Sequence, residues 1–169
     1  QTKWIFICLE NGTEQNWPFT IEDKILVTPL FIKSVSTQSL AETLAHERIH
    51  NLQWKHPKAF SDFYQTLGFK QIGLKGMDSV VHYSNPDGLQ LPDRSWVLSR
   101  NNTMYLPLMV YKQGQVKKKL YKLKESNGNY FLDNKGESYK CEKALNSILP
   151  ETEPSQCYHP HEMLADLGS

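Results

Sequence analysis

The stretch "LAETLAHERIHNLQWKHP", residues 40–57, decides how the rest of this 169-residue sequence is interpreted. Its aliphatic residues recur at helical spacing and predict one apolar stripe: Leu40, Leu44, Ile49 and Leu52. Three residues shortly before it are possible N-caps: Ser36, Thr37 and Ser39. We therefore expect an α-helix that begins near these caps and ends at about Lys55.

Two histidines on this helix, His46 and His50, lie four residues apart. Residues at i and i+4 share one helix face, so both imidazoles can point at the same metal ion. Glu47 lies about 100° around the helix from His46, which places its carboxylate beside such an ion. His-Glu-x-x-His on a helix is typical of zinc metallopeptidases, with the glutamate as general base. The alternative is an ordinary helix with coincidental histidines.

A catalytic zinc ion needs a third protein ligand and an open position, and two residues compete for that role. The first is His56, which has the spacing of the metzincin pattern HExxHxxGxxH. Position 53 is Gln, however, and the pattern has Gly there because Gly lets the chain turn sharply. A helix that continues would carry His56 too far along, and His56-Pro57 fits a corner between two helices.

The second candidate for the third ligand is Glu162, in "YHPHEMLADL" near the end of the chain. Asp166 follows four residues later, hence on the same face of an expected helix. Such spacing has a physical use, because the glutamate can bind zinc while the aspartate accepts the N–H of a zinc-bound histidine. An ordinary helix N-terminal glutamate, stabilised by the helix dipole, is the other explanation of Glu162.

The two motifs "HERIH" and "HEMLAD" together resemble the gluzincin group of zinc peptidases. The resemblance implies that His46, His50 and Glu162 are zinc ligands. It implies that Glu47 is the general base and that Asp166 is the partner of His46. The chain also resembles small HExxH proteins of large DNA viruses and microalgae, in "HExxHxxQ" before a helix with Pro, Phe and Tyr and in a late "YHPxExxAD".

The sequence departs from the gluzincin pattern in the distance between the motifs, since Glu162 follows His50 by 112 positions (162 minus 50). Residues 70–140 hold short aromatic and β-branched runs such as "SWVLS", "MYLPLMVYK" and "NYFLD", separated by turn residues. Asn127-Gly128 is a strong hairpin signal. We expect a β-meander inserted between the two metal-bearing helices, which costs little if the ends of the insertion meet.

The remaining elements are predicted from local signals. Residues 3–10 are apolar and indicate a buried strand, and residues 23–32 indicate a second strand, interrupted by Pro29. Pro57 suits the first turn of another helix that Gly68 ends. Residues 142–149 suggest a short helix, and a last helix begins at "HPHEMLADL".

A hydrogen-bond donor to the oxyanion is expected beside the zinc ion. Tyr158 is the first choice, because a phenol donates while neutral. His159 and His161, next to Glu162, and His82 from the β-rich region are alternatives.

The length suits a single compact domain over residues 1–169, and the elements predict an α+β, zincin-like fold. A net charge of +1 gives no field that favours nucleic acid or membranes, and no targeting or membrane-spanning segment is expected. We therefore expect a monomeric zinc metallopeptidase that acts on a peptide or protein substrate. The alternatives are a metzincin-type site completed by His56, a zincin-fold binding module without activity, and a protein without metal.

Overall fold

A computed structural model describes residues 3–73, 95–112, 115–133 and 159–167. Its contacts divide the chain into two compact units. The first unit comprises Gln1–Phe60 with Leu164–Ser169, and the second comprises Ser61–Met163. Both division points fall inside helices, α3 (Pro57–Thr66) and α6 (Pro160–Leu167), so each of these helices contributes to both units.

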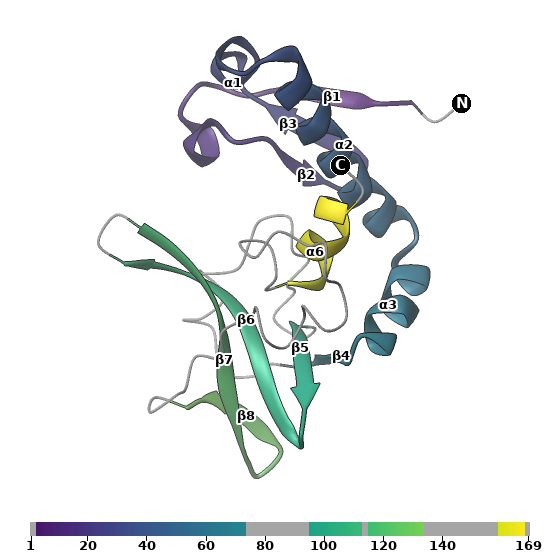
Figure 1. Cartoon of the computed structure of the whole chain (residues 1–169), viewed down its shortest axis with the longest axis vertical. Helices are drawn as coiled ribbons and strands as arrows, with labels where there is room; N and C mark the ends of the chain where they lie inside the picture. The colour runs from purple at the N-terminus through teal and green to yellow at the C-terminus, as the bar shows by residue number, and fades with distance from the viewer. Residues whose placement is uncertain (1–2, 74–94, 113–114, 134–158, 168–169) are drawn as a thin grey trace. The chain divides into compact units, whose positions relative to one another are not determined.

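The first unit contains a three-stranded sheet in the order β1-β3-β2 (Figure 1). Strand β1 (Ile5–Cys8) runs parallel to β3 (Lys24–Val27), and β2 (Phe19–Ile21) runs antiparallel to it. A short 3-10 helix, η1 (Thr13–Asn16), lies in the loop between β1 and β2. A strand is therefore present within residues 3–10, but the prediction that it is buried is wrong, because all four residues of β1 are exposed.

The strand predicted over residues 23–32 is only half right. It ends at Val27, and α1 (Pro29–Ser34) follows at once. Thr28 caps this helix, because its Oγ1 accepts a hydrogen bond from the backbone N–H of Phe31 at 3.2 Å. Pro29 has the fixed φ that suits a first helical position, so it begins a helix here instead of interrupting a strand.

Helix α2 (Thr37–Lys55) has the predicted extent, and Ser36 is its N-cap. The Oγ of Ser36 accepts a hydrogen bond from the N–H of Ser39 at 3.1 Å. α2 packs against β2 and β3. Four polar residues of α2 are buried: Glu47, His50, Asn51 and Gln53.

The residues of α2 that are fully buried are not those of the apolar stripe predicted from the sequence. The residues of that stripe are only partly buried: Leu40, Leu44, Ile49 and Leu52. The helix turns its polar residues inward, where Thr20 on β2 and the backbone of Glu22 provide hydrogen bonds. Burial of polar groups is tolerated because those groups are paired.

The second unit contains a five-stranded antiparallel sheet in which each strand pairs with the next along the chain (Figure 1). The strands are β4 (Phe69–Ile72), β5 (Ser95–Arg100), β6 (Thr103–Lys112), β7 (Gln115–Ser126) and β8 (Asn129–Leu132). Asn127 and Gly128 have φ of +52° and +76° and form the tight turn between β7 and β8. The predicted β-meander is thus present among the described residues.

The buried residues that cluster on this sheet are apolar. Four residues form its buried cluster: Val97, Leu106, Leu108 and Leu123. Gly68 follows α3 with a φ of +90°, and its carbonyl accepts the N–H of Ser99 at 2.9 Å. A residue with a side chain would be strained in that conformation, so Gly68 ends the helix as predicted.

The described residues form a mixed α+β structure with four α-helices and two sheets. Whether residues 1–169 form one domain and whether the fold is zincin-like stay predictions. The helix expected at residues 142–149 lies outside the described residues. No described helix has both the length and the apolar character needed to span a membrane.

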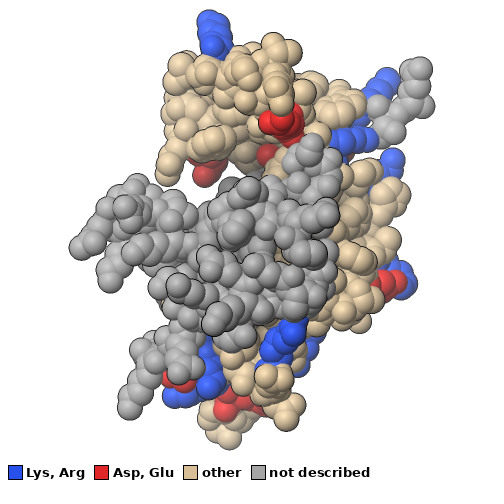
Figure 2. All heavy atoms as spheres, viewed as in Figure 1, with Lys and Arg blue, Asp and Glu red and all other residues tan. Residues whose placement is uncertain are grey.

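Charged side chains of both signs lie near one another on the described surface that Figure 2 shows. Lys124 on β7 forms an ion pair with Asp133, in which Nζ and Oδ1 are 2.9 Å apart. Lys24 likewise lies between the carboxylates of Glu22 and Asp23, at 3.2 and 2.8 Å. Pairs of this kind at the surface contribute little stability.

Candidate metal centre

The two histidines of the HExxH motif face each other on α2. The Nε2 atoms of His46 and His50 are 3.1 Å apart, and their ring planes meet at 77°. Nitrogen ligands bind zinc at roughly 2.0–2.1 Å, so two nitrogens at this separation subtend an angle of about 100° at one ion. That angle is close to tetrahedral, and the pair therefore fits two positions of a zinc site.

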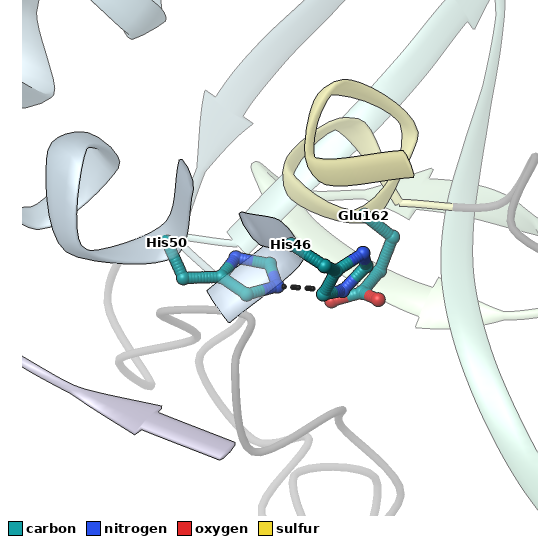
Figure 3. Close-up of side chains that lie close together, drawn as sticks. All are labelled: His46, His50 and Glu162. Carbon is teal, nitrogen blue, oxygen red and sulfur yellow. Dashed lines mark hydrogen bonds between the residues drawn. The ribbon is translucent and has the colours of Figure 1, made fainter. Parts of the chain in front are cut away.

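Glu162 on α6 joins this histidine pair, as Figure 3 shows. One ligand atom from each of His46, His50 and Glu162 lies within 4.8 Å of the other two. His50 is 1% exposed and Glu162 4% exposed, while His46 is half-buried. A buried carboxylate requires a cation or hydrogen bonds to offset its desolvation. The three residues could hold a metal ion, and their two nitrogens and one oxygen are ligands that zinc accepts.

Glu47, the residue between the two histidines, is held by the neighbouring sheet. Its side chain is 3% exposed, and the Oγ1 of Thr20 lies 2.7 Å from its Oε2. The hydroxyl of Thr20 also lies 3.1 Å from the backbone carbonyl of Glu47. Thr20 is fully buried at the centre of β2. The carboxylate is therefore fixed by a residue 27 positions earlier in the sequence.

His50 has a second partner within α2. Its Nδ1 lies 2.8 Å from the Oε1 of Gln53, and Gln53 is 2% exposed. No role at the site was predicted for Gln53 or for Thr20. The spacing of three residues between His50 and Gln53 could have revealed the first, because i and i+3 are neighbours on a helix. No local signal points to Thr20, which requires the packing of β2 on α2.

Tyr64 lies near Glu162, and both residues belong to the second unit. Its fully buried ring packs edge-on against Trp96, with centroids 5.1 Å apart, and against His161 at 5.3 Å. Burial raises the pKa of the Tyr64 phenol, and the nearby Glu162 carboxylate raises it further. The phenol is therefore neutral at ordinary pH and keeps its O–H for donation.

The candidates for an oxyanion donor divide into described and undescribed residues. His159 is fully buried and His161 is 5% exposed. The backbone N–H of His161 donates to the Nδ1 of His159 at 3.2 Å. Tyr158, the first choice, and His82 lie outside the described residues.

Two more predicted positions complete the account. Asp166 lies in α6 one turn after Glu162, as expected, but its side chain lies outside the description. His56 is the exposed C-cap of α2, and its N–H donates to the carbonyl of Leu52 at 2.8 Å. His56 is not among the residues that gather as possible metal ligands in the described part of the chain.

A pocket of about 640 Å³ lies within the first unit, apart from the possible metal ligands. Helix α2 contributes five of its lining residues: Arg48, Asn51, Leu52, Trp54 and Lys55. His46, Glu47 and His50 are not among its lining residues.

No protein-family model, curated protein or solved structure matches this chain.

Proposed function

We propose that this protein is a zinc metallopeptidase in which His46, His50 and Glu162 bind the zinc ion. The observation that carries the proposal is the gathering of these three residues with their ligand atoms within 4.8 Å of one another. Two of them flank Glu47 on α2, in the order that the HExxH motif requires. Coincidental histidines on an ordinary helix would have no reason to gather with a buried carboxylate from the other end of the sequence.

Zinc in this site would supply a Lewis acid that polarises the scissile carbonyl and acidifies water. Glu47 takes a proton from the attacking water and then delivers it to the leaving amine. Thr20 holds the Glu47 carboxylate through its short hydrogen bond, so the base is oriented before substrate binds. Burial of Glu47 keeps competing water away from the carboxylate.

Two further residues have roles in this proposal. By the gluzincin resemblance, Asp166 accepts the N–H of His46 and fixes its tautomer. Tyr158 donates a hydrogen bond to the oxyanion, because a phenol can donate while neutral. The domain is zincin-like, with the β-meander as an insertion between the two metal-bearing helices. It acts as a monomer on a peptide or protein substrate.

The experiment that tests the proposal combines metal analysis with peptide hydrolysis. We expect purified protein to bind one zinc ion per chain and to cleave members of a mixed peptide library. A chelator should abolish the cleavage, and zinc should restore it. Glu47→Gln should keep the zinc ion but lower kcat by about 10²–10⁴-fold, the usual contribution of general acid–base catalysis. Glu42→Gln, an exposed glutamate on the same helix, is the matched control.

Two outcomes would reject the proposal. If the protein binds zinc but cleaves no peptide, and Glu47→Gln changes none of its properties, it is a zincin-like binding module. If elemental analysis finds no zinc and added zinc does not raise Tm, the residues do not form a metal site.

A further inference from the structure

Gln53 makes a contact with the HExxH motif that the HExxH chemistry does not itself require. Its Oε1 lies 2.8 Å from the Nδ1 of His50, and both side chains are at most 2% exposed. The two residues lie three positions apart on α2, so a single helix holds the pair. Their geometry therefore does not depend on how the other elements of the chain are placed.

The contact has a chemical consequence for His50. A neutral imidazole carries one N–H and one lone pair, and a partner on one nitrogen decides which nitrogen has which. The amide oxygen of Gln53 only accepts hydrogen bonds, so it selects the form of His50 protonated at Nδ1. The lone pair is then on Nε2, the atom that faces the Nε2 of His46 at 3.1 Å.

We propose that Gln53 is a positioning residue that presets the tautomer and ring orientation of His50 for metal binding. This inference rests on the proposed zinc site. A histidine that binds a metal normally donates its other N–H to a carboxylate, carbonyl or water. Gln53 fills this role with a neutral acceptor. It therefore orients the ring without adding a second buried negative charge to a helix that already buries Glu47.

The orientation of the Gln53 amide decides which tautomer of His50 is favoured, because the oxygen of an amide accepts hydrogen bonds and its NH₂ group donates them. If the NH₂ group faced Nδ1 instead, it would donate to that nitrogen. The proton of His50 would then be on Nε2, and the lone pair needed for the metal would be missing. The two orientations thus predict opposite tautomers, which can be measured without any metal.

The first test is nitrogen NMR of the histidine side chains in the metal-free protein at a pH where His50 is neutral. We expect wild-type His50 to be protonated at Nδ1. Gln53→Met keeps an unbranched side chain but replaces the amide oxygen with a sulfur that accepts hydrogen bonds only weakly, and His50 should become a mixture of tautomers. Gln53→Glu restores an acceptor and should restore the Nδ1-protonated form. Gln38→Met is the control, because Gln38 is an exposed residue of α2 bonded to Glu42.

The second test is zinc affinity in the same variants. Loss of a supporting partner typically weakens metal binding by about 10–100-fold, so we expect that loss in Gln53→Met and none in Gln38→Met. Gln53→Glu should recover most of the affinity. A merely structural role would instead lower the stability of Gln53→Met without changing the His50 tautomer.

Three results would overturn the inference. One is a wild-type His50 protonated at Nε2, and another is an unchanged tautomer in Gln53→Met. The third applies if Gln53→Met does not fold. Gln53→Glu is then the variant to measure, and a His50 protonated at Nε2 in that variant would overturn the inference. A protein that binds no zinc contradicts the proposed function, whereas the NMR result on the metal-free protein still accepts or rejects the role of Gln53.

Discussion

The inward face of α2 and the residue cluster on the β4–β8 sheet are both buried, but α2 buries polar residues and the sheet buries apolar ones. The sheet buries Val97, Leu106 and other aliphatic side chains. α2 buries Glu47, His50 and Gln53, each with a hydrogen-bond partner. Burial of aliphatic groups stabilises a fold directly, by about 25 cal/mol per Å² of apolar surface. Burial of polar groups costs free energy that their partners offset only in part.

A buried polar face of a helix contributes less to stability than an apolar face of equal size, so a chemical role is the economical explanation for it. Substitutions in the sheet should therefore change stability and spare metal binding. Substitutions on the inward face of α2 should change chemistry more than stability.

The largest expected effect is on stability, from Leu106→Ala in the sheet. Leu106 is fully buried, and a buried Leu→Ala substitution typically lowers the free energy of unfolding by about 2–5 kcal/mol. Urea denaturation measures the loss, with Phe131→Ala at a 48%-exposed position of β8 as control. Zinc bound per folded molecule should not change. A loss below 1 kcal/mol, roughly the level of a surface substitution, would mean that the apolar cluster of the sheet contributes little to stability.

The next effect is on metal affinity, from Glu162→Ala. Removing a ligand should weaken zinc binding by more than about 100-fold, because loss of a mere supporting residue already costs 10–100-fold. A competitive chelator titration measures it, and His56→Ala serves as the paired variant. A metzincin-type site would give the reverse result, with zinc lost in His56→Ala and kept in Glu162→Ala.

A smaller effect on catalysis is expected from Thr20→Val. This variant keeps the shape of the side chain but removes the donor to the Glu47 carboxylate. A hydrogen bond to a charged group contributes about 1.5–3 kcal/mol, which corresponds to a fall in kcat of roughly 10–100-fold. Zinc affinity should be unchanged. Thr43→Val on α2, whose hydroxyl donates to the Ser39 carbonyl, should leave kcat as it is.

The smallest effect concerns alkaline pH. The pKa of Tyr64 is raised above its ordinary value of 10.0 in the folded protein. Above pH 10 the unfolded chain therefore loses the phenol proton of Tyr64, while the folded protein keeps it. The free energy of unfolding then falls as pH rises, by at most about 1.4 kcal/mol per pH unit from this group. Tyr64→Phe should flatten that fall in the free energy of unfolding. An identical pH dependence in the two proteins would mean that Tyr64 ionises normally.

Much of the fold could be predicted because its signals are local. Ser36, Pro57 and Gly68 mark helix ends by the chemistry of caps and φ angles, and Asn127-Gly128 marks a tight turn. The prediction for residues 23–32 is wrong after Val27. Thr28 and Pro29 were assigned to the strand, but together they form the cap and the first turn of α1. That error too lay in local chemistry.

The candidate site was predicted less completely, because part of it depends on packing. The spacing of His46 and His50 indicated a common ligand face, and the structure gathers Glu162 with them. The buried face of α2 could not be inferred from hydrophobic periodicity, since its inward residues are polar. Thr20 is joined to Glu47 only by the packing of β2 against the helix.

X-ray absorption spectroscopy of the zinc-loaded protein identifies the atoms that bind the zinc ion. We expect two imidazole nitrogens at about 2.0–2.1 Å and light oxygen ligands, with no sulfur. Glu162→Ala should change the oxygen shell and leave both imidazoles in place. Three imidazoles would contradict the assignment of Glu162, and a sulfur ligand at about 2.3 Å would contradict the site altogether.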